Sequence, residues 1–166
     1  MVAKFRKRFS DKSMRRPGYD YSNPGAYFIT LVTKNRVKYF GKPVQGIMQL
    51  SEIGSVACRH WLKIPEHFAN VELGSFIIMP DHIHGIIIKR KDPEVSPNLG
   101  DPSPIPNWQP GALGVIINQF KRISTIKSRK INPEFAWQSR YHDRIIRNMG
   151  EYNRISKYIL DNPGKW

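Results

Sequence analysis

Cysteine is nearly absent from this sequence, and hydrophobic runs of membrane-spanning length are missing. Cys58 is the single cysteine in 166 residues, which excludes an internal disulfide and any cysteine-rich zinc module. No stretch reaches the roughly 18 consecutive apolar residues of a membrane span, and none resembles a secretion signal. We therefore expect a cytoplasmic protein without a membrane partner.

Acidic residues are also scarce. Only 13 Asp and Glu oppose 27 Lys and Arg, which leaves a net charge of +14. A field of this size attracts nucleic acid by releasing condensed counterions, although a merely basic, soluble surface would give the same count. With 40% hydrophobic residues the chain has enough apolar surface to fold, and its length fits a single domain over residues 1–166. We expect a nucleic-acid partner.

Alternating and helical hydrophobic patterns predict the secondary structure. A basic arm is expected at 1–16 and a proline-rich connection at 90–112. Ser51 is expected to cap the first helix and Pro65 to end it. The strands are expected at 26–33, 71–79, 82–89 and about 137–147, a short hairpin at 37–50, and helices at 51–64, 113–129 and 150–160. The order β-α-β-β-α-β with a further C-terminal helix indicates an α+β fold, a ferredoxin-like split βαβ antiparallel sheet like that of RRM and palm domains.

Two histidines stand at the start of the strand expected at 82–89. His82 and His84 are separated by one residue, so both imidazoles point to one face of the strand. Two nitrogen ligands side by side suit a first-row divalent ion. Ordinary half-buried strand residues would show the same short pattern, since Ile86 and Ile88 share that face.

Tyr158 and Asn162 lie four residues apart, on one face of the C-terminal helix. A hydroxyl nucleophile and a further metal ligand would then lie together. A tyrosine phenol has an ordinary pKa of about 10, so its attack on a phosphodiester is helped by a nearby cation. The alternative is that Tyr158 belongs to the core, as part of one apolar stripe formed by Tyr152, Ile155, Tyr158 and Ile159.

Three segments of the sequence resemble the HUH single-tyrosine transposases, and most closely their REP-associated branch. Residues 79–85, Met-Pro-Asp-His-Ile-His-Gly, are similar to the histidine-hydrophobe-histidine motif of that family. Residues 137–163 resemble its C-terminal block, through Trp137-Gln138, Tyr141, Arg144 and the run Tyr158-Ile159-Leu160-Asp161-Asn162-Pro163. Residues 15–30 resemble its opening, through Arg15-Arg16, Tyr19, Tyr21, Gly25-Ala26-Tyr27-Phe28 and Thr30. The resemblance therefore spans nearly the whole chain.

The resemblance implies a metal-dependent enzyme that cuts and rejoins single-stranded DNA, and therefore a DNA partner and a nucleoid-associated location. His82 and His84 would bind one Mg²⁺ or Mn²⁺ ion per site, with Asn162 as a further ligand. Tyr158 would attack a DNA phosphate, which gives a 5′-phosphotyrosine link and a free 3′-OH that later rejoins the strand. Two departures from the family are Asp81, where asparagine is frequent, and a short C-terminal segment after Tyr158.

The substrates of the family are single strands with hairpins, so basic residues are the expected phosphate contacts. Tyr19 and Tyr21 are candidates for stacking on unpaired bases. Members of the family act as monomers or as homodimers that exchange the tyrosine helix, and Gly150 is the one glycine placed to supply the joint for such an exchange. The residues expected to contact DNA are Arg15, Arg16, Lys121, Arg122, Lys127, Arg144 and Lys157.

Two other functions fit the same sequence. A domesticated protein that binds the DNA hairpins of repeated elements without cleaving them would share the basic charge. A replication or mobilisation initiator would share the HUH chemistry, but such proteins usually carry helicase or relaxase regions, which this sequence does not show.

The remaining titratable residues have simpler interpretations. His142 and Asp143 lie beside arginines and are expected to form a solvated structural cluster. His60 and His67 have no partner at ligand spacing and are expected at the surface. Cys58 lies on the apolar side of its helix and is expected to be a small core residue.

Overall fold

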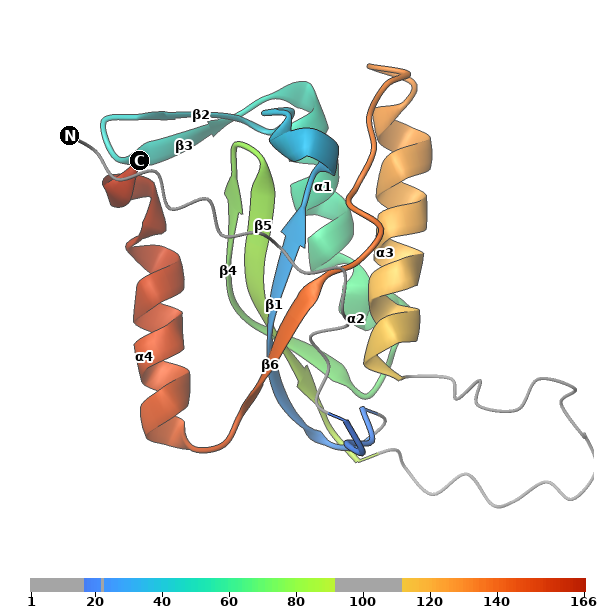
Figure 1. Cartoon of the computed structure of the whole chain (residues 1–166), viewed down its shortest axis with the longest axis vertical. Coiled ribbons are helices and arrows are strands. Elements are labelled where there is room, and N and C mark those ends of the chain that lie inside the picture. Colours follow the sequence, from blue (N-terminus) through green and yellow to red (C-terminus); the bar gives the residue numbers. More distant parts are fainter. Residues whose placement is uncertain (1–16, 22, 92–111) are drawn as a thin grey trace, which may run out of the picture.

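The computed structural model describes residues 17–21, 23–91 and 112–166 (Figure 1). The expected basic arm at 1–16 and most of the connection at 90–112 lie outside the described residues, as do Arg15 and Arg16. No helix in the described ranges has the length and apolar character that crossing a bilayer requires. The elements are β1 (Gly25–Val32), η1 (Lys34–Arg36), β2 (Gly41–Val44), β3 (Ile47–Leu50), α1 (Glu52–Leu62), α2 (Ile64–His67), β4 (Val71–Met79), β5 (His82–Lys89), α3 (Leu113–Ser128), β6 (His142–Ile146), α4 (Met149–Leu160) and η2 (Asn162–Lys165).

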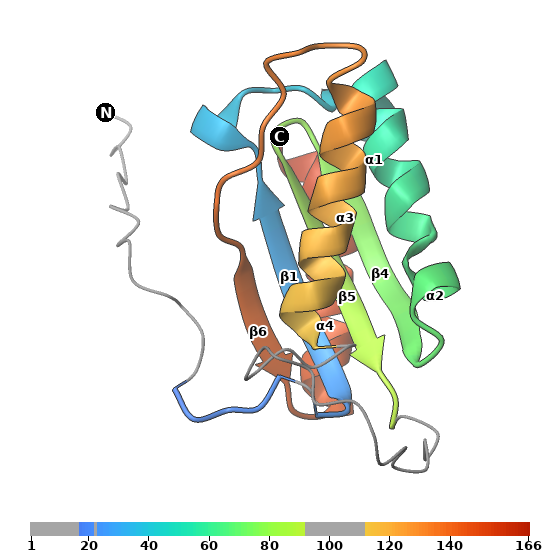
Figure 2. The same cartoon turned by 90° about the vertical axis from the view of Figure 1, so that its right-hand side faces the viewer.

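Four strands form one antiparallel sheet in the order β4-β5-β1-β6. This order is that of the split βαβ arrangement, so the fold class expected from the sequence is confirmed. Helices α1, α2 and α3 cover one face of the sheet, and α4 lies against the opposite face (Figures 1 and 2). The expected hairpin at 37–50 is present as a separate two-stranded sheet, β2 and β3.

The alternation of side chains along β1 and β5 divides the core into two layers. Tyr27, Ile29 and Leu31 are fully buried against α1 and α3, where Trp61 is also fully buried. The intervening residues of both strands face α4, and Ile86 packs there beneath that helix. Full burial of one large apolar side chain contributes roughly 1.5–3 kcal/mol, so both layers stabilise the sheet that carries the histidines.

The first helix differs from the expectation at its C-terminal end. Ser51 is its N-cap as expected, since Gly54 N–H donates to Ser51 Oγ at 3.0 Å. The helix ends at Leu62, before Pro65, and this proline lies in the first turn of the separate helix α2. A proline is tolerated there because its missing N–H would have no helical partner in any case.

The last strand is shorter than the expected 137–147. Trp137 forms only an isolated bridge with Thr33, and β6 begins at His142. The carbonyl groups of Gln138 and Arg140 accept hydrogen bonds from Lys121 Nζ, at 2.7 and 3.2 Å. The segment before His142 is thereby bonded to a side chain of α3 and forms no ladder.

Candidate active site

The two histidines of β5 lie on the face of the sheet that α4 covers. His84 is paired with Thr30 of β1 and His82 with Val32. Their ring centroids are 4.6 Å apart, and each residue is only 8% exposed. The two-residue turn Pro80–Asp81 between β4 and β5 places the pair at the very start of the strand. Two imidazoles are therefore held side by side, as the spacing of the sequence predicts.

Each imidazole is oriented by a hydrogen bond at its Nδ1 atom. His84 Nδ1 lies 2.9 Å from Thr30 Oγ1, and His82 Nδ1 lies 2.5 Å from Asp81 Oδ1. Within the described part of the chain neither Nε2 atom makes a hydrogen bond. Partners of this kind fix the tautomer and the orientation of a ring whose other nitrogen binds a metal. The motif did not reveal Thr30, because its place beside His84 depends on the register between β1 and β5.

The carboxyl group of Asp81 lies between two groups that stabilise its ionised form. Arg36 NH1 lies 3.3 Å from Asp81 Oδ2, and His82 contacts the other oxygen. Burial alone would raise the pKa of Asp81, but the hydrogen bond and charge of His82 and the charge of Arg36 hold that pKa below its ordinary value. The departure from asparagine at this position thus adds a charged partner for the first histidine.

The imidazole of His84 lies in a nearly dry environment. Burial, followed by the neighbouring His82, lowers the pKa of His84 to about 3. Phe28 covers it from β1, with ring centroids 5.3 Å apart. At neutral pH the ring is therefore uncharged.

Tyr158 stands on α4 with its ring beside this histidine. The centroids of Tyr158 and His84 are 5.6 Å apart, and those of Tyr158 and Phe28 are 6.3 Å apart. The residue is 44% exposed, whereas Ile155 and Ile159 of the same helix are buried. The interpretation of Tyr158 as a core residue is therefore wrong: the isoleucines bind the helix to the sheet, and the phenol stays accessible to a ligand.

Two contacts between β4 and α4 set the position of the tyrosine helix. Ser75 and Ser156 are hydrogen bonded through their hydroxyl groups. One residue earlier on β4, a Cβ at Gly74 would come within 2.6 Å of the Tyr152 hydroxyl, so only glycine allows this close approach. A register irregularity in β4 between Leu73 and Phe76 brings both small residues to the helix.

The N-terminus of α4 is fixed by hydrogen bonds to the side chains of Asn148 and Glu151. Glu151 N–H donates to Asn148 Oδ1 at 2.8 Å, and Arg147 N–H donates to Glu151 Oε2 at 3.0 Å. Arg144 of β6 also donates to Glu151 Oε1, at 2.5 Å. The expected joint residue Gly150 lies inside the first turn of α4, among these hydrogen bonds, and not ahead of the helix.

Asn162 follows one helical turn after Tyr158, as the first residue of η2. It is 6% exposed, and its amide Nδ2 has no hydrogen-bond partner among the residues that the structure describes. The assignment of oxygen and nitrogen within an amide can be exchanged, so this buried group is equally able to present an oxygen. Among the described residues, no group of three or more His, Cys, Asp or Glu side chains is arranged so that it could hold a metal ion. A site here would therefore combine two imidazoles with an amide, a donor set that leaves positions for water or phosphate.

The residues expected to contact DNA are spread over both faces of the sheet. Lys121, Arg122 and Lys127 belong to α3, on the face opposite to Tyr158 (Figure 2). Lys121 is moreover bonded to two carbonyl groups, and burial lowers its pKa to about 8, so it is a structural donor and not a free surface charge. Lys157 is exposed on α4, next to the tyrosine. Among the described candidates, Lys157 alone is adjacent to the catalytic candidates in the sequence.

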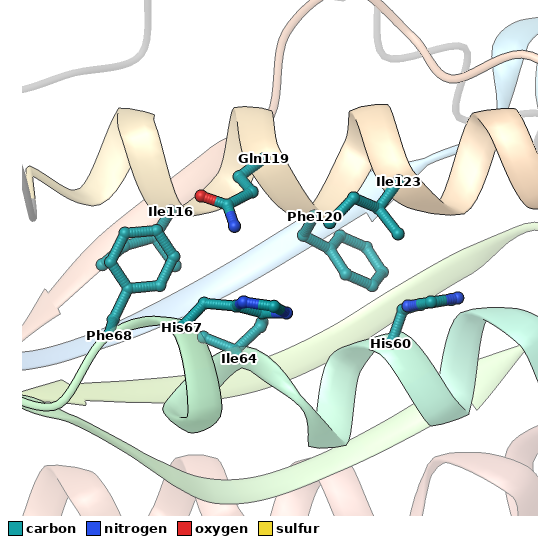
Figure 3. A pocket seen from close by; sticks show the side chains of 8 residues that line it. All are labelled: His60, Ile64, His67, Phe68, Ile116, Gln119, Phe120 and Ile123. Carbon is teal, nitrogen blue, oxygen red and sulfur yellow. The ribbon is translucent and has the colours of Figure 1, made fainter.

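Of the two histidines expected at the surface, His67 is exposed as expected, whereas His60 is only partly exposed. His60 and His67 line one shallow pocket between α1, α2 and α3 together with Gln119 (Figure 3). His60 is half-buried, and burial lowers its pKa, followed by the charge of Lys63. This pocket lies on the face of the sheet opposite to the site and takes no part in it.

Two further expectations concern Cys58 and the pair formed by His142 and Asp143. Cys58 is half-buried against the core, and burial raises its pKa, as expected of a core thiol. The cluster at His142 and Asp143 is not fully solvated, because both residues are half-buried and the carboxylate oxygens of Asp143 are shielded from solvent. His142 is paired with Thr30, which places it on the histidine face.

Comparison with known proteins gives one relative by sequence and several by structure. No family model matches the sequence. An uncharacterized protein of Haemophilus influenzae is 35% identical over 162 residues, which cover 93% of this chain and 89% of that protein. A solved REP-associated tyrosine transposase, bound to a REP hairpin, superposes with a TM-score of 0.62 at 19% identity, over 93% of this chain and 73% of that chain. A Deinococcus radiodurans protein described as a candidate transposase reaches a TM-score of 0.49 at 15% identity, over 89% of this chain and 95% of that one.

Proposed function

Because the chain belongs to one family with the Haemophilus influenzae protein and has the fold of a REP-associated tyrosine transposase, we propose that it is a single-strand DNA transposase. The observation that carries this proposal is the accessible ring of Tyr158 at 5.6 Å from the ring of His84. A net charge of +14 supports a DNA partner. The solved transposase was bound to a REP hairpin, and we extend to this chain a substrate class of single strands that carry hairpins.

The residues of the site fit one Mg²⁺ or Mn²⁺ ion. His82 and His84 would offer their Nε2 atoms, since both Nδ1 atoms are engaged. Asn162 would offer its amide oxygen, which would give the buried group a partner. When bound, the ion supplies positive charge at the phosphoryl oxygens and at the attacking phenol. Thr30 and Asp81 would act as positioning residues that keep both rings turned toward it.

The proposed reaction is a transesterification at a DNA phosphate. The Oη atom of Tyr158 bonds to phosphorus while the bond from phosphorus to the 3′ oxygen breaks. The phenol loses its proton to solvent, and the departing 3′ oxygen gains one. The number of phosphate ester bonds is unchanged, so the free 3′-OH can attack the tyrosine linkage and rejoin the strand without a nucleoside triphosphate.

Positive charge around the tyrosine supports the binding of an anionic strand. Lys165 Nζ lies 5.4 Å from the ring centroid of Tyr158. Lys157, which directly precedes Tyr158 in α4, is exposed. These side chains would contact phosphates that flank the reacting one, while the anchored helix holds the phenol in place.

Covalent trapping tests the proposal. Hairpin oligonucleotides with randomised single-stranded flanks and a fluorescent label are incubated with Mn²⁺, and the products are separated by denaturing electrophoresis. We expect a protein-sized labelled band that Tyr158→Phe abolishes. Tyr152→Phe is the matched control, because Tyr152 lies on the same helix but contacts β4, and this variant should keep the band.

The outcome also separates the two classes of function. An adduct that persists in the Tyr158→Phe protein would contradict the assignment of the nucleophile. Tight binding of hairpins by the wild-type protein without any adduct would favour the alternative of a non-cleaving hairpin-binding protein.

A further inference from the structure

The indole of Trp166 lies beside the histidine pair. Its ring centroid is 6.0 Å from that of His82, with the planes 41° apart, and the residue is 49% exposed. The rings of Trp166, His82, His84 and Tyr158 thus follow one another, with centroid separations of 6.0, 4.6 and 5.6 Å. No feature of the sequence pattern distinguishes this tryptophan from the other three.

The short helix η2 holds the indole in this position. Asn162 and Pro163 are buried at its start, and Gly164 N–H bonds back to Asp161 at 3.3 Å. Gly164 also approaches the turn of the β2–β3 hairpin, where a Cβ at Gly46 would lie 4.0 Å from its Cα. The indole therefore follows a turn that is hydrogen bonded to the end of α4 and lies beside the turn of the β2–β3 hairpin.

Two lysines stand at the ends of this row of rings. Lys38 Nζ lies 5.6 Å from the centroid of Trp166, and Lys165 Nζ lies 5.4 Å from that of Tyr158. Lys38 is exposed, so its long side chain is able to move aside from the indole face. An exposed aromatic face with cations beside it is the combination by which proteins hold single-stranded DNA, through base stacking and phosphate contact.

We propose that Trp166 is a stacking subsite for the unpaired base next to the phosphate that Tyr158 attacks, with Lys38 and Lys165 as contacts for the flanking phosphates. This subsite rests on the proposed function, since it places the reacting phosphate between Tyr158 and the histidines. A base stacked on the indole would hold the strand in register for the attack. The contact would tolerate any base, because every base offers a π face.

Binding measured with abasic DNA tests the subsite. The probe is a fluorescein-labelled DNA hairpin with single-stranded thymidine flanks, in which each flank position in turn is replaced by an abasic site. The protein carries Tyr158→Phe throughout, so binding is measured without cleavage. We expect Trp166→Ala to weaken binding of the intact probe about tenfold or more. The same substitution should have no effect on the probe that is abasic at one particular position.

Two control variants separate stacking from a general loss of structure. Trp166→Phe keeps an aromatic face and should bind close to the level of the parent protein. Leu160→Ala removes another exposed apolar side chain, 61% exposed on α4, and should leave the affinity unchanged.

Two results would overturn the subsite. Equal or tighter binding by the Trp166→Ala protein would mean that the indole covers the site and does not hold a base. A loss of affinity that is the same for all abasic probes would mean that no single base meets the indole. If only the trapping reaction fails, the proposed function is refuted. The joint effect of Trp166→Ala and the abasic position on DNA binding can still be measured.

Discussion

The rings of Tyr158 and His84 lie 5.6 Å apart, centroid to centroid, within one chain. The nucleophile proposed here is therefore beside its histidines without the help of a second subunit. A co-expressed mixture of His84→Ala and Tyr158→Phe proteins has no chain with a complete site. We predict that this mixture forms no covalent adduct above the level of the separate variants, measured by denaturing electrophoresis. Recovery of the adduct would show that subunits exchange the tyrosine helix.

Thr30 is predicted to control metal affinity through the orientation of His84. Thr30→Val removes the hydroxyl group that lies 2.9 Å from His84 Nδ1 and keeps the shape of the side chain. We expect Mn²⁺ binding to weaken about 10–100-fold, as measured by titration calorimetry. Thr30→Ser keeps the hydroxyl group and should bind as the wild type does. Equal affinities of the valine and serine variants would contradict this role.

Asn148 is predicted to stabilise the tyrosine helix as its N-cap. Asn148→Ala removes the acceptor for Glu151 N–H, and such a change costs about 1 kcal/mol in the free energy of unfolding. Denaturant unfolding measures this loss. Asn153→Ala, at an exposed position in the middle of the same helix, is the control and should not destabilise. A loss as large in the control would place the effect outside the cap.

Glu151 is predicted to make the same helix sensitive to acid. The hydrogen bond from the Arg147 backbone N–H, with further help from Arg144, lowers the pKa of Glu151 below 4.5. The stabilisation of the folded protein by the Glu151 carboxylate is therefore fully present above pH 4.5 and is lost as the pH falls through the lowered pKa. Glu151→Gln should lower the melting temperature at neutral pH, and the difference from wild type should shrink in acid. A difference that does not change with pH would contradict this assignment.

Gly85 is predicted to be required beneath Trp61. A Cβ at position 85 would overlap Trp61 Cζ2, so Gly85→Ala should destabilise the protein by about 1–3 kcal/mol. In a Trp61→Phe background the added methyl group has more room and should cost less, which a double-mutant cycle measures. Gly164→Ala, with no neighbour within 4 Å of the added Cβ, is the control. An additive cycle would refute the contact.

The strand that carries the two histidines and its neighbour β1 were predictable because local pattern determines them. Apolar side chains on both faces of 26–33 predict a central strand, observed as β1 (Gly25–Val32), and 82–89 is predicted as the returning strand of a hairpin, observed as β5 (His82–Lys89). The period of two then places His82 and His84 on one face, whatever the rest of the fold. The turn residues Pro80–Asp81 predict the hairpin between β4 and β5 in the same local way.

The exposure of Tyr158 was not predictable, because it depends on long-range contacts. The four-residue spacing of the last helix allows either the tyrosine or the isoleucines to face the sheet. The contact of Ser75 with Ser156 joins residues 81 positions apart and decides between them. A contact between residues so far apart in the sequence cannot be predicted from a local pattern.

The hydrogen bonds of Lys121 and the position of Trp166 beside His82 were not predicted, for a similar reason. A helical pattern puts Lys121 at the surface, but the pattern does not show that the carbonyl groups of the following segment lie within reach of its Nζ. The position of Trp166 depends on the turn of η2 against the hairpin. Both are tertiary contacts in which at least one partner is an irregular segment, and such a segment has no periodicity from which the contact could be predicted.

Anomalous diffraction from a crystal grown with Mn²⁺ tests the central claim most directly. We expect one anomalous peak at bonding distance from the Nε2 atoms of His82 and His84, with Tyr158 of the same chain facing it. A peak bound elsewhere, or a tyrosine supplied by a neighbouring chain, would contradict the account.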